Sequence, residues 1–240
     1  MKIEARYTDG TYLSQNPDWD RQDSGWKASK ILEMLRSHQL EPTSICEVGC
    51  GAGDILVHLR REMPRTSMSG FDISPQLARI WEHHEESGVG VQFNLGNFHE
   101  VNQQMWDVVL MCDVFEHVRD PFTFLELTRE HGRYFIFHVP LDLSVLSLLR
   151  GTPLINVRKK VGHLHFYTKD LALATLTDSG YQILRWQYTN ASSFAASRSW
   201  SAKLAHLVRY VGYGLDKDFG VRLLGGETLL VLARSASAPS

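Results

Sequence analysis

The sequence lacks the features that identify membrane-embedded, secreted or zinc-binding proteins. No apolar run reaches the roughly 18 residues that a membrane-spanning helix needs. The N-terminus has no basic segment followed by an apolar stretch, so we expect no signal peptide. The cysteines number three, and their spacing fits no zinc or redox signature, which favours a reducing compartment. We therefore expect a cytoplasmic protein.

No excess of one charge sign is present either. The net charge is −2 and basic clusters such as residues 158–160 are short, so nothing favours binding to nucleic acid. The chain has 240 residues, of which 43% are apolar and 22% charged, as expected for a globular protein with one sizeable core. No internal repeat divides it, and we predict a single domain over residues 1–240.

Short apolar runs alternate with amphipathic segments along the chain. Strands are predicted over residues 44–48, 67–73, 91–95, 106–112, 133–139, 181–188 and 227–233, and helices over residues 23–41, 54–63, 75–81, 121–131 and 169–179. This alternation indicates an α/β fold, a mostly parallel sheet with helices on both faces. The last two strands lack a clear helical crossover.

A glycine turn follows the first predicted strand, in the pattern Glu47-x-Gly49-x-Gly51-x-Gly53. Glycine tolerates positive φ and lets a ligand approach the backbone, and in an open α/β sheet such a turn lies where ligands bind. A dinucleotide fingerprint needs its third glycine at position 54, but Asp54 stands there, where a pyrophosphate would bind. The acid disfavours NAD(P), and the lack of a following Lys-Ser/Thr pair excludes a P-loop.

A phosphate-free zwitterion fits this turn better. S-adenosylmethionine (SAM) carries an ammonium, a sulfonium and one carboxylate, and Glu47 at the strand end can attract its cationic end. Asp72 ends the second strand about 20 residues after the glycine turn, where a carboxylate can accept hydrogen bonds from both ribose hydroxyls. The alternative for Asp72 is a helix N-cap before Pro75.

Three segments together resemble the class I SAM-dependent methyltransferases: residues 47–53 (EVGCGAG), 70–74 (GFDIS) and 113–121 (DVFEHVRDP). The likeness covers roughly residues 25–140 and points to the branch of ubiquinone-biosynthesis-type O-methyltransferases, which residues 162–168 also resemble. It implies a Rossmann-like seven-stranded sheet of order 3-2-1-4-5-7-6, with the seventh strand antiparallel.

The resemblance also implies where SAM binds. The matching positions are Glu47, Gly49, Cys50, Gly51, Gly53, Asp72, Ile73, Asn97, Phe98, Cys112, Asp113 and Val114. Asn97 stands where the family often has an acid for the adenine amino group, and an amide oxygen can accept the same hydrogen bond. Phe98 would pack on the adenine, and Cys112 and Asp113 would lie under the methionyl part.

His117 is the candidate catalytic residue, as a general base beside the expected methyl position. An imidazole pKa of about 6.5 suits this task, which is needed only if the acceptor must lose a proton. The alternative is a structural histidine. In some ubiquinone-type relatives the positions of Asp113, Glu116 and His117 bind a divalent metal; from the sequence alone we assign no metal site.

Other segments are candidates for the acceptor side. The predicted substrate-pocket residues are Trp26, His138, His163 and His165, although we favour a packing role for the last two. About residues 1–40 are expected to include a lid helix that closes the site with Trp19, Trp26 and Lys27. Apolar stretches at about residues 141–162 and 191–222 are extra to the core; they either pack on the sheet, which we favour, or cover a bulky acceptor near a membrane surface.

The sequence thus predicts an enzyme that transfers a methyl group from SAM, its cofactor, to a small-molecule acceptor, at an oxygen. The alternative is a SAM-binding module without turnover that acts through a partner. We expect a monomer or homodimer whose partner is the small-molecule acceptor, with no nucleic acid and no favoured membrane contact.

Overall fold

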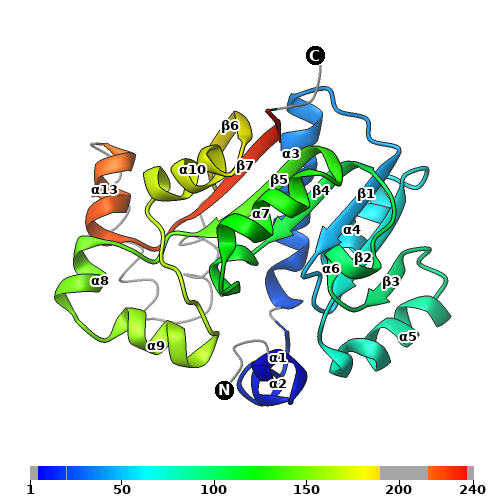
Figure 1. Ribbon diagram of the computed structural model, residues 1–240, viewed down its shortest axis with the longest axis horizontal. Helices are drawn as coiled ribbons and strands as arrows, with labels where there is room; N and C mark the ends of the chain where they lie inside the picture. Colours follow the sequence, from blue (N-terminus) through cyan, green and yellow to red (C-terminus); the bar gives the residue numbers. More distant parts are fainter. Residues whose placement is uncertain (1–4, 20, 190–215, 237–240) are drawn as a thin grey trace.

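Seven strands form one mixed sheet in the order β3-β2-β1-β4-β5-β7-β6 (Figure 1). The computed structural model describes residues 5–19, 21–189 and 216–236. The strands are β1 (Ser44–Val48), β2 (Ser67–Asp72), β3 (Gln92–Leu95), β4 (Trp106–Cys112), β5 (Gly132–Pro140), β6 (Tyr181–Tyr188) and β7 (Thr228–Ser235). β7 runs antiparallel to both β5 and β6, and the other neighbouring strands are parallel. The predicted fold class and strand order are confirmed.

The central strand β4 is buried on both faces of the sheet. Its side chains alternate between two hydrophobic clusters, with Val109 and Met111 in one and Val108 and Leu110 in the other. This double burial explains why β4 is a continuous apolar run rather than an alternating one. One face is covered by α3 (Ser24–Ser37), α4 (Asp54–Glu62) and α5 (Ala78–Glu86), and the other by α6 (Phe98–Val101), α7 (Pro121–Arg129) and α10 (Lys169–Asp178).

The sequence patterns did not predict the shortest helices as separate elements. These are α1 (Ala5–Thr8), α2 (Thr11–Gln15), α6, α8 (Val145–Leu149), α9 (Pro153–Lys160), α13 (Lys217–Leu224) and the 3₁₀ turns η1 (Arg21–Asp23), η2 (Pro75–Leu77) and η3 (Phe115–His117). Helices this short are marginal in isolation and form through tertiary contacts. The segment expected to hold the lid helix therefore contains α1, α2 and η1 before the longer α3.

The first apolar insertion forms α8 and α9, between β5 and α10 (Figure 1). Leu148 and Leu149 are 60% and 80% exposed, whereas Val157 and Val161 line the cavity described below. Of the second stretch, residues 191–215 lie outside the described residues, and the rest belongs largely to α13. Within the described ranges, no helix has the length and apolarity to cross a membrane.

Candidate cofactor and acceptor site

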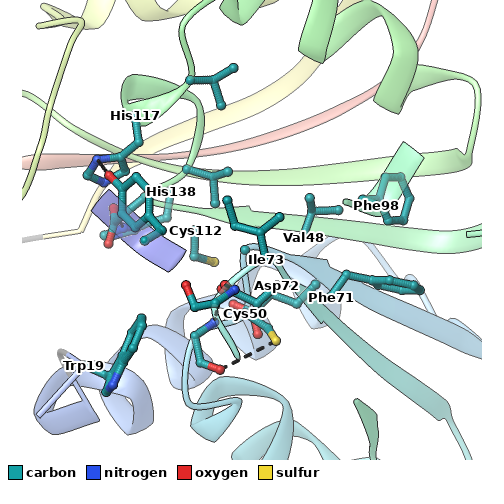
Figure 2. Close-up of a pocket in the computed structure, with 18 of the residues that line it drawn as sticks. Trp19, Val48, Cys50, Phe71, Asp72, Ile73, Phe98, Cys112, His117 and His138 are labelled. Carbon is teal, nitrogen blue, oxygen red and sulfur yellow. Dashed lines mark hydrogen bonds and ion pairs between the residues drawn. The ribbon is translucent and has the colours of Figure 1, made fainter. Parts of the chain in front are cut away.

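A cavity of about 1060 Å³ lies at the carboxyl ends of β1, β2 and β4, the edge where open α/β sheets bind ligands. It is lined by all the residues predicted to contact SAM, although they come from separate segments. Trp26, His117, His138 and His163 line it as well. In Figure 2, His117 and His138 lie together on one side of the cavity and Phe98 on the other.

The glycine turn has little room for side chains except at one position. Gly49 and Gly53 have φ values of 70° and 81°. A Cβ on Gly53 would lie 2.2 Å from Cε1 of Phe93, whereas a Cβ on Gly51 would meet nothing within 4 Å. Because Gly51 lines the cavity, a ligand can approach the turn closely at its backbone.

Asp72 lines the cavity and accepts hydrogen bonds from two backbone amides. Its Oδ2 accepts a hydrogen bond from the Gly51 amide at 2.9 Å, and its Oδ1 accepts one from the Ser74 amide at 2.9 Å. Burial raises the pKa of this carboxyl, and the backbone amides oppose that effect. Since each carboxylate oxygen has a second lone pair, the predicted ribose contact is compatible with both backbone contacts.

Glu47 is a buried carboxyl at the end of β1, with one oxygen that lacks a hydrogen-bond partner among the described residues. It is 1% exposed, and the oxygen without a partner is Oε2. Burial raises the pKa of Glu47 to about 8, although the nearby Lys27 lowers it. Ionising such a group is costly unless a positive charge compensates it. This end of the cavity therefore suits a positively charged ligand.

A chain of polar contacts joins α3 to β5 and β7 through the residue after β4. The Lys27 ammonium lies 2.6 Å from Oδ2 of Asp113, whose Oδ1 lies 2.9 Å from Nδ1 of His138. Nε2 of His138 lies 3.0 Å from Oγ1 of Thr228, and Trp26 packs edge-on against the His138 ring. Asp113 has a φ of 55°, a costly conformation for a residue other than glycine. Burial opposes its ionisation, but Lys27 and His138 hold the pKa of Asp113 well below its usual range.

A second polar cluster lies on the acceptor side. Nδ1 of His117 lies 2.9 Å from the Tyr7 hydroxyl, and Nδ1 of His163 lies 2.5 Å from Oδ2 of Asp142. Burial and the neighbouring His163 lower the pKa of His117 to about 3, so its ring is neutral. Glu116, His117 and His163 each offer one ligand atom within 4.8 Å of the others, which makes them a candidate metal-binding group among the described residues.

Two predicted residues have other contacts than expected. His165 does not line the cavity, and its Nε2 lies 3.0 Å from the Val118 carbonyl oxygen, a contact compatible with a packing role. Asn97 does line the cavity, but its Oδ1 accepts a hydrogen bond from the His99 amide at 3.1 Å and caps α6. Only the second lone pair of that oxygen is left for an adenine amino group.

Sequence reasoning missed Tyr7, Asp142 and Thr228. Their partners lie 110, 21 and 90 residues away in the chain, so no local pattern reveals them. An ionic partner of Lys27 could have been predicted, because Lys27 falls on the buried side of the α3 pattern and a buried lysine needs such a partner.

Comparison with known proteins identifies the family. A methyltransferase-domain family matches residues 19–185, which include the glycine turn, Asp72 and the Asp113–His117 segment. The chain belongs to this family. It is a class I SAM-dependent methyltransferase domain, and its cofactor is SAM.

Curated relatives of this methyltransferase are distant. It is 22% identical over 125 residues to a malonyl-[acyl-carrier protein] O-methyltransferase of Halalkalibacterium halodurans, over 50% of this chain and 46% of the relative. It is 30% identical over 92 residues to a ubiquinone biosynthesis O-methyltransferase of Serratia proteamaculans, over 37% of each chain. The matches thus span less than half the length of these relatives.

Solved structures share the fold over nearly the whole chain. The plantazolicin methyltransferase BpumL, in complex with a monoazolic desmethylPZN analogue and S-adenosylhomocysteine (SAH), superposes with a TM-score of 0.63. The match covers 97% of this chain and 93% of that one at 15% sequence identity. At this identity the likeness establishes the fold and leaves the acceptor open.

Proposed function

We propose that this methyltransferase transfers the methyl group of SAM to an oxygen of a small-molecule acceptor. The acceptor oxygen attacks the methyl carbon in line with the sulfur. As the C–O bond forms, the C–S bond breaks, its electron pair stays on sulfur to give SAH, and the hydroxyl proton goes to a base. Because the sulfonium is already an activated leaving group, positioning supplies much of the catalysis.

The observation that carries the proposal is the continuity of the cavity. Gly51, Asp72 and Glu47, which suit a cationic nucleoside, line the same cavity as His117 and His138, and these two histidines lie together on one side of it (Figure 2). The glycine turn would hold the cofactor, and the same cavity would hold an acceptor within reach of imidazole side chains. Imidazoles are the side chains best suited to take a proton from a hydroxyl near neutral pH.

Of the two imidazoles, His138 has the better surroundings for a base. Protonated His117 is strongly disfavoured by its burial. His138, in contrast, can donate Nδ1–H to ionised Asp113, which keeps the Nε2 lone pair free to accept a proton and stabilises the imidazolium. The Thr228 hydroxyl beside Nε2 lines the cavity and can relay the proton. We therefore propose His138 as the base and a different role for His117.

Release of SAH tests this function. The purified protein and SAM are incubated separately with phenols and catechols, with carboxylic acids and with primary amines, and SAH is quantified. We expect SAH release above the acceptor-free rate with compounds that offer an oxygen. Release with amines alone would overturn the choice of oxygen, and bound SAM without SAH release in any mixture would favour the binding module without turnover.

A further inference from the structure

Helix α9 (Pro153–Lys160) is held in place without a buried residue of its own. None of its eight residues is buried, and Ile155 is 50% exposed. Nevertheless Val157, in the helix, and Val161, directly after it, line the cavity. A helix this short is marginal in isolation, and its apolar packing is shallow. Contacts other than a hydrophobic core must therefore fix its position.

The C-terminal end of α9 has carbonyl oxygens that the helix itself does not satisfy. Gly162, with a φ of 95°, follows the helix, and its amide donates a hydrogen bond to the Val157 carbonyl oxygen at 3.2 Å. The carbonyl oxygens of the next three residues belong to the last turn, where no further helical amide reaches them. They form the negative end of the helix dipole, where a cation is favourable.

Arg6 places a cation at this end of α9 from the distant α1 (Figure 1). Its Nη1 donates a hydrogen bond to the Arg158 carbonyl oxygen at 3.2 Å. Its Nη2 donates to the carbonyl oxygens of Lys159 and Lys160 at 2.5 Å and 2.8 Å, and Nδ2 of Asn16 donates to that of Lys160 at 3.2 Å. The three basic side chains of this turn are exposed, so water screens their charges from the guanidinium.

His117 joins the same junction from the turn after β4. Its Nδ1 lies 2.9 Å from the Tyr7 hydroxyl, which α1 carries next to Arg6. Burial and His163 lower the pKa of His117, whereas a hydrogen bond with the Gly162 backbone raises it. In a neutral imidazole one nitrogen donates and the other accepts. The His117 ring therefore links the Tyr7 hydroxyl to the backbone that directly follows α9.

Gly162 lies where α1, η3 and the end of α9 meet. A Cβ on Gly162 would lie 2.9 Å from the Tyr7 hydroxyl oxygen and 3.2 Å from Nη1 of Arg6. Gly151, just before α9, also has a positive φ, of 68°, but a Cβ there would meet nothing within 4 Å. The two glycines flank the same helix with the same backbone requirement, and only Gly162 lies in the junction.

We propose that Arg6 is a positioning residue that fixes the C-terminal end of α9, assisted by Asn16 and His117. The apolar wall that Val157 and Val161 contribute to the cavity then depends on α1, although Arg6 lies 152 residues from Arg158 in the chain. Because α9 leads directly into His163, this wall belongs to the acceptor side. The consequence for the acceptor rests on the proposed function, whereas the junction itself does not.

Amide hydrogen exchange, followed by mass spectrometry, tests the junction without an acceptor. Arg6→Ala removes the guanidinium from three carbonyl oxygens, and Gly162→Ala places a methyl group against Tyr7 and Arg6. In both variants the amides of residues 157–162 should exchange at least about tenfold faster, because bonds from a charged donor oppose local opening. Gly151→Ala is the matched control and should leave this exchange unchanged. Wild-type protection in Arg6→Ala would overturn the proposal.

Turnover separates the acceptor role from a general loss of stability. SAH release is measured over a range of concentrations of an oxygen acceptor that the wild type methylates. Arg6→Ala should raise the acceptor KM about tenfold, while kcat and the Kd for SAH stay within about threefold, because α9 would contact the acceptor alone. A wild-type KM in Arg6→Ala would overturn the acceptor role. If the wild type methylates no acceptor, the proposed function fails, and hydrogen exchange still decides the junction.

Discussion

The ammonium of Lys27 and the carboxylate of Asp113 form an ion pair of 2.6 Å between helix α3 and the end of strand β4. The Lys27 side chain is only 9% exposed, and its ammonium also lies 3.1 Å from Asp23. The pair holds Asp113 beside His138, and with it one wall of the cavity. Helix α3 is thus part of the site.

Lys27→Met should destabilise the protein strongly. The substitution leaves a largely buried carboxylate with His138 as its main remaining partner, and breaking such a pair costs on the order of 3 kcal/mol. Urea denaturation measures the change. Lys30→Met is the control on the same helix, because its pair with the 60% exposed Glu33 is worth no more than about 0.5 kcal/mol. Equal losses in the two variants would contradict the importance of the Lys27 pair.

Two glycines of the same turn should respond differently to alanine. Gly53→Ala places a methyl group against Phe93 at a φ of 81° and should cost at least about 2 kcal/mol of stability. Gly51→Ala meets open space, so it should cost about 1 kcal/mol for its positive φ but weaken SAH binding, because the methyl group enters the cavity. Denaturation and calorimetry separate the two effects. Unchanged SAH affinity in Gly51→Ala would mean that the ligand does not touch the turn.

SAM should bind more tightly as the pH rises from 6 to 7.5. The pKa of Glu47 is about 8 in the empty site, so the carboxyl is protonated in this range, whereas its ionised form attracts the ligand's ammonium. Binding must then release a proton, and Kd should fall by up to about tenfold per pH unit. Calorimetry in buffers of different ionisation enthalpy detects that proton. Glu47→Gln should bind weakly with a flat pH profile; a flat profile in the wild type would rule out the role of Glu47.

The fold was predictable where local patterns suffice. Strands β1, β4 and β6 have the predicted bounds because each is a short β-rich segment between turn-forming residues. The antiparallel position of β7 between β5 and β6 came from the family resemblance, since no local pattern fixes which strands pair.

The site was predictable only in part for the same reason. The predicted cofactor residues lie at or just after strand ends. The short motifs that contain Gly51 and Asp72 could therefore be recognised in the sequence, and both residues line the cavity. The burial of Glu116 and the contacts of Tyr7 and Asp142 are tertiary properties, because each depends on a segment far away in the sequence.

His138→Gln should lower kcat by about 10²- to 10⁴-fold while the Kd for SAH stays within about threefold, because a general base acts on the acceptor alone. The loss should shrink with acceptors of lower pKa, which a merely structural role would not produce. Thr228→Val should lower kcat as His138→Gln does, whereas Thr228→Ser, which keeps the hydroxyl, should turn over as the wild type does. Full activity of His138→Gln would remove it as the base.

Calorimetric titration of the folded protein with SAM, SAH and NADH tests the central claim most directly. Asp54 occupies the first turn of α4 and is ion-paired with Arg21, so this helix N-terminus has no place for a pyrophosphate. We predict 1:1 binding of SAM and SAH and none of NADH. Binding of NADH, or no binding of SAM and SAH by protein with the expected circular dichroism, would contradict the account.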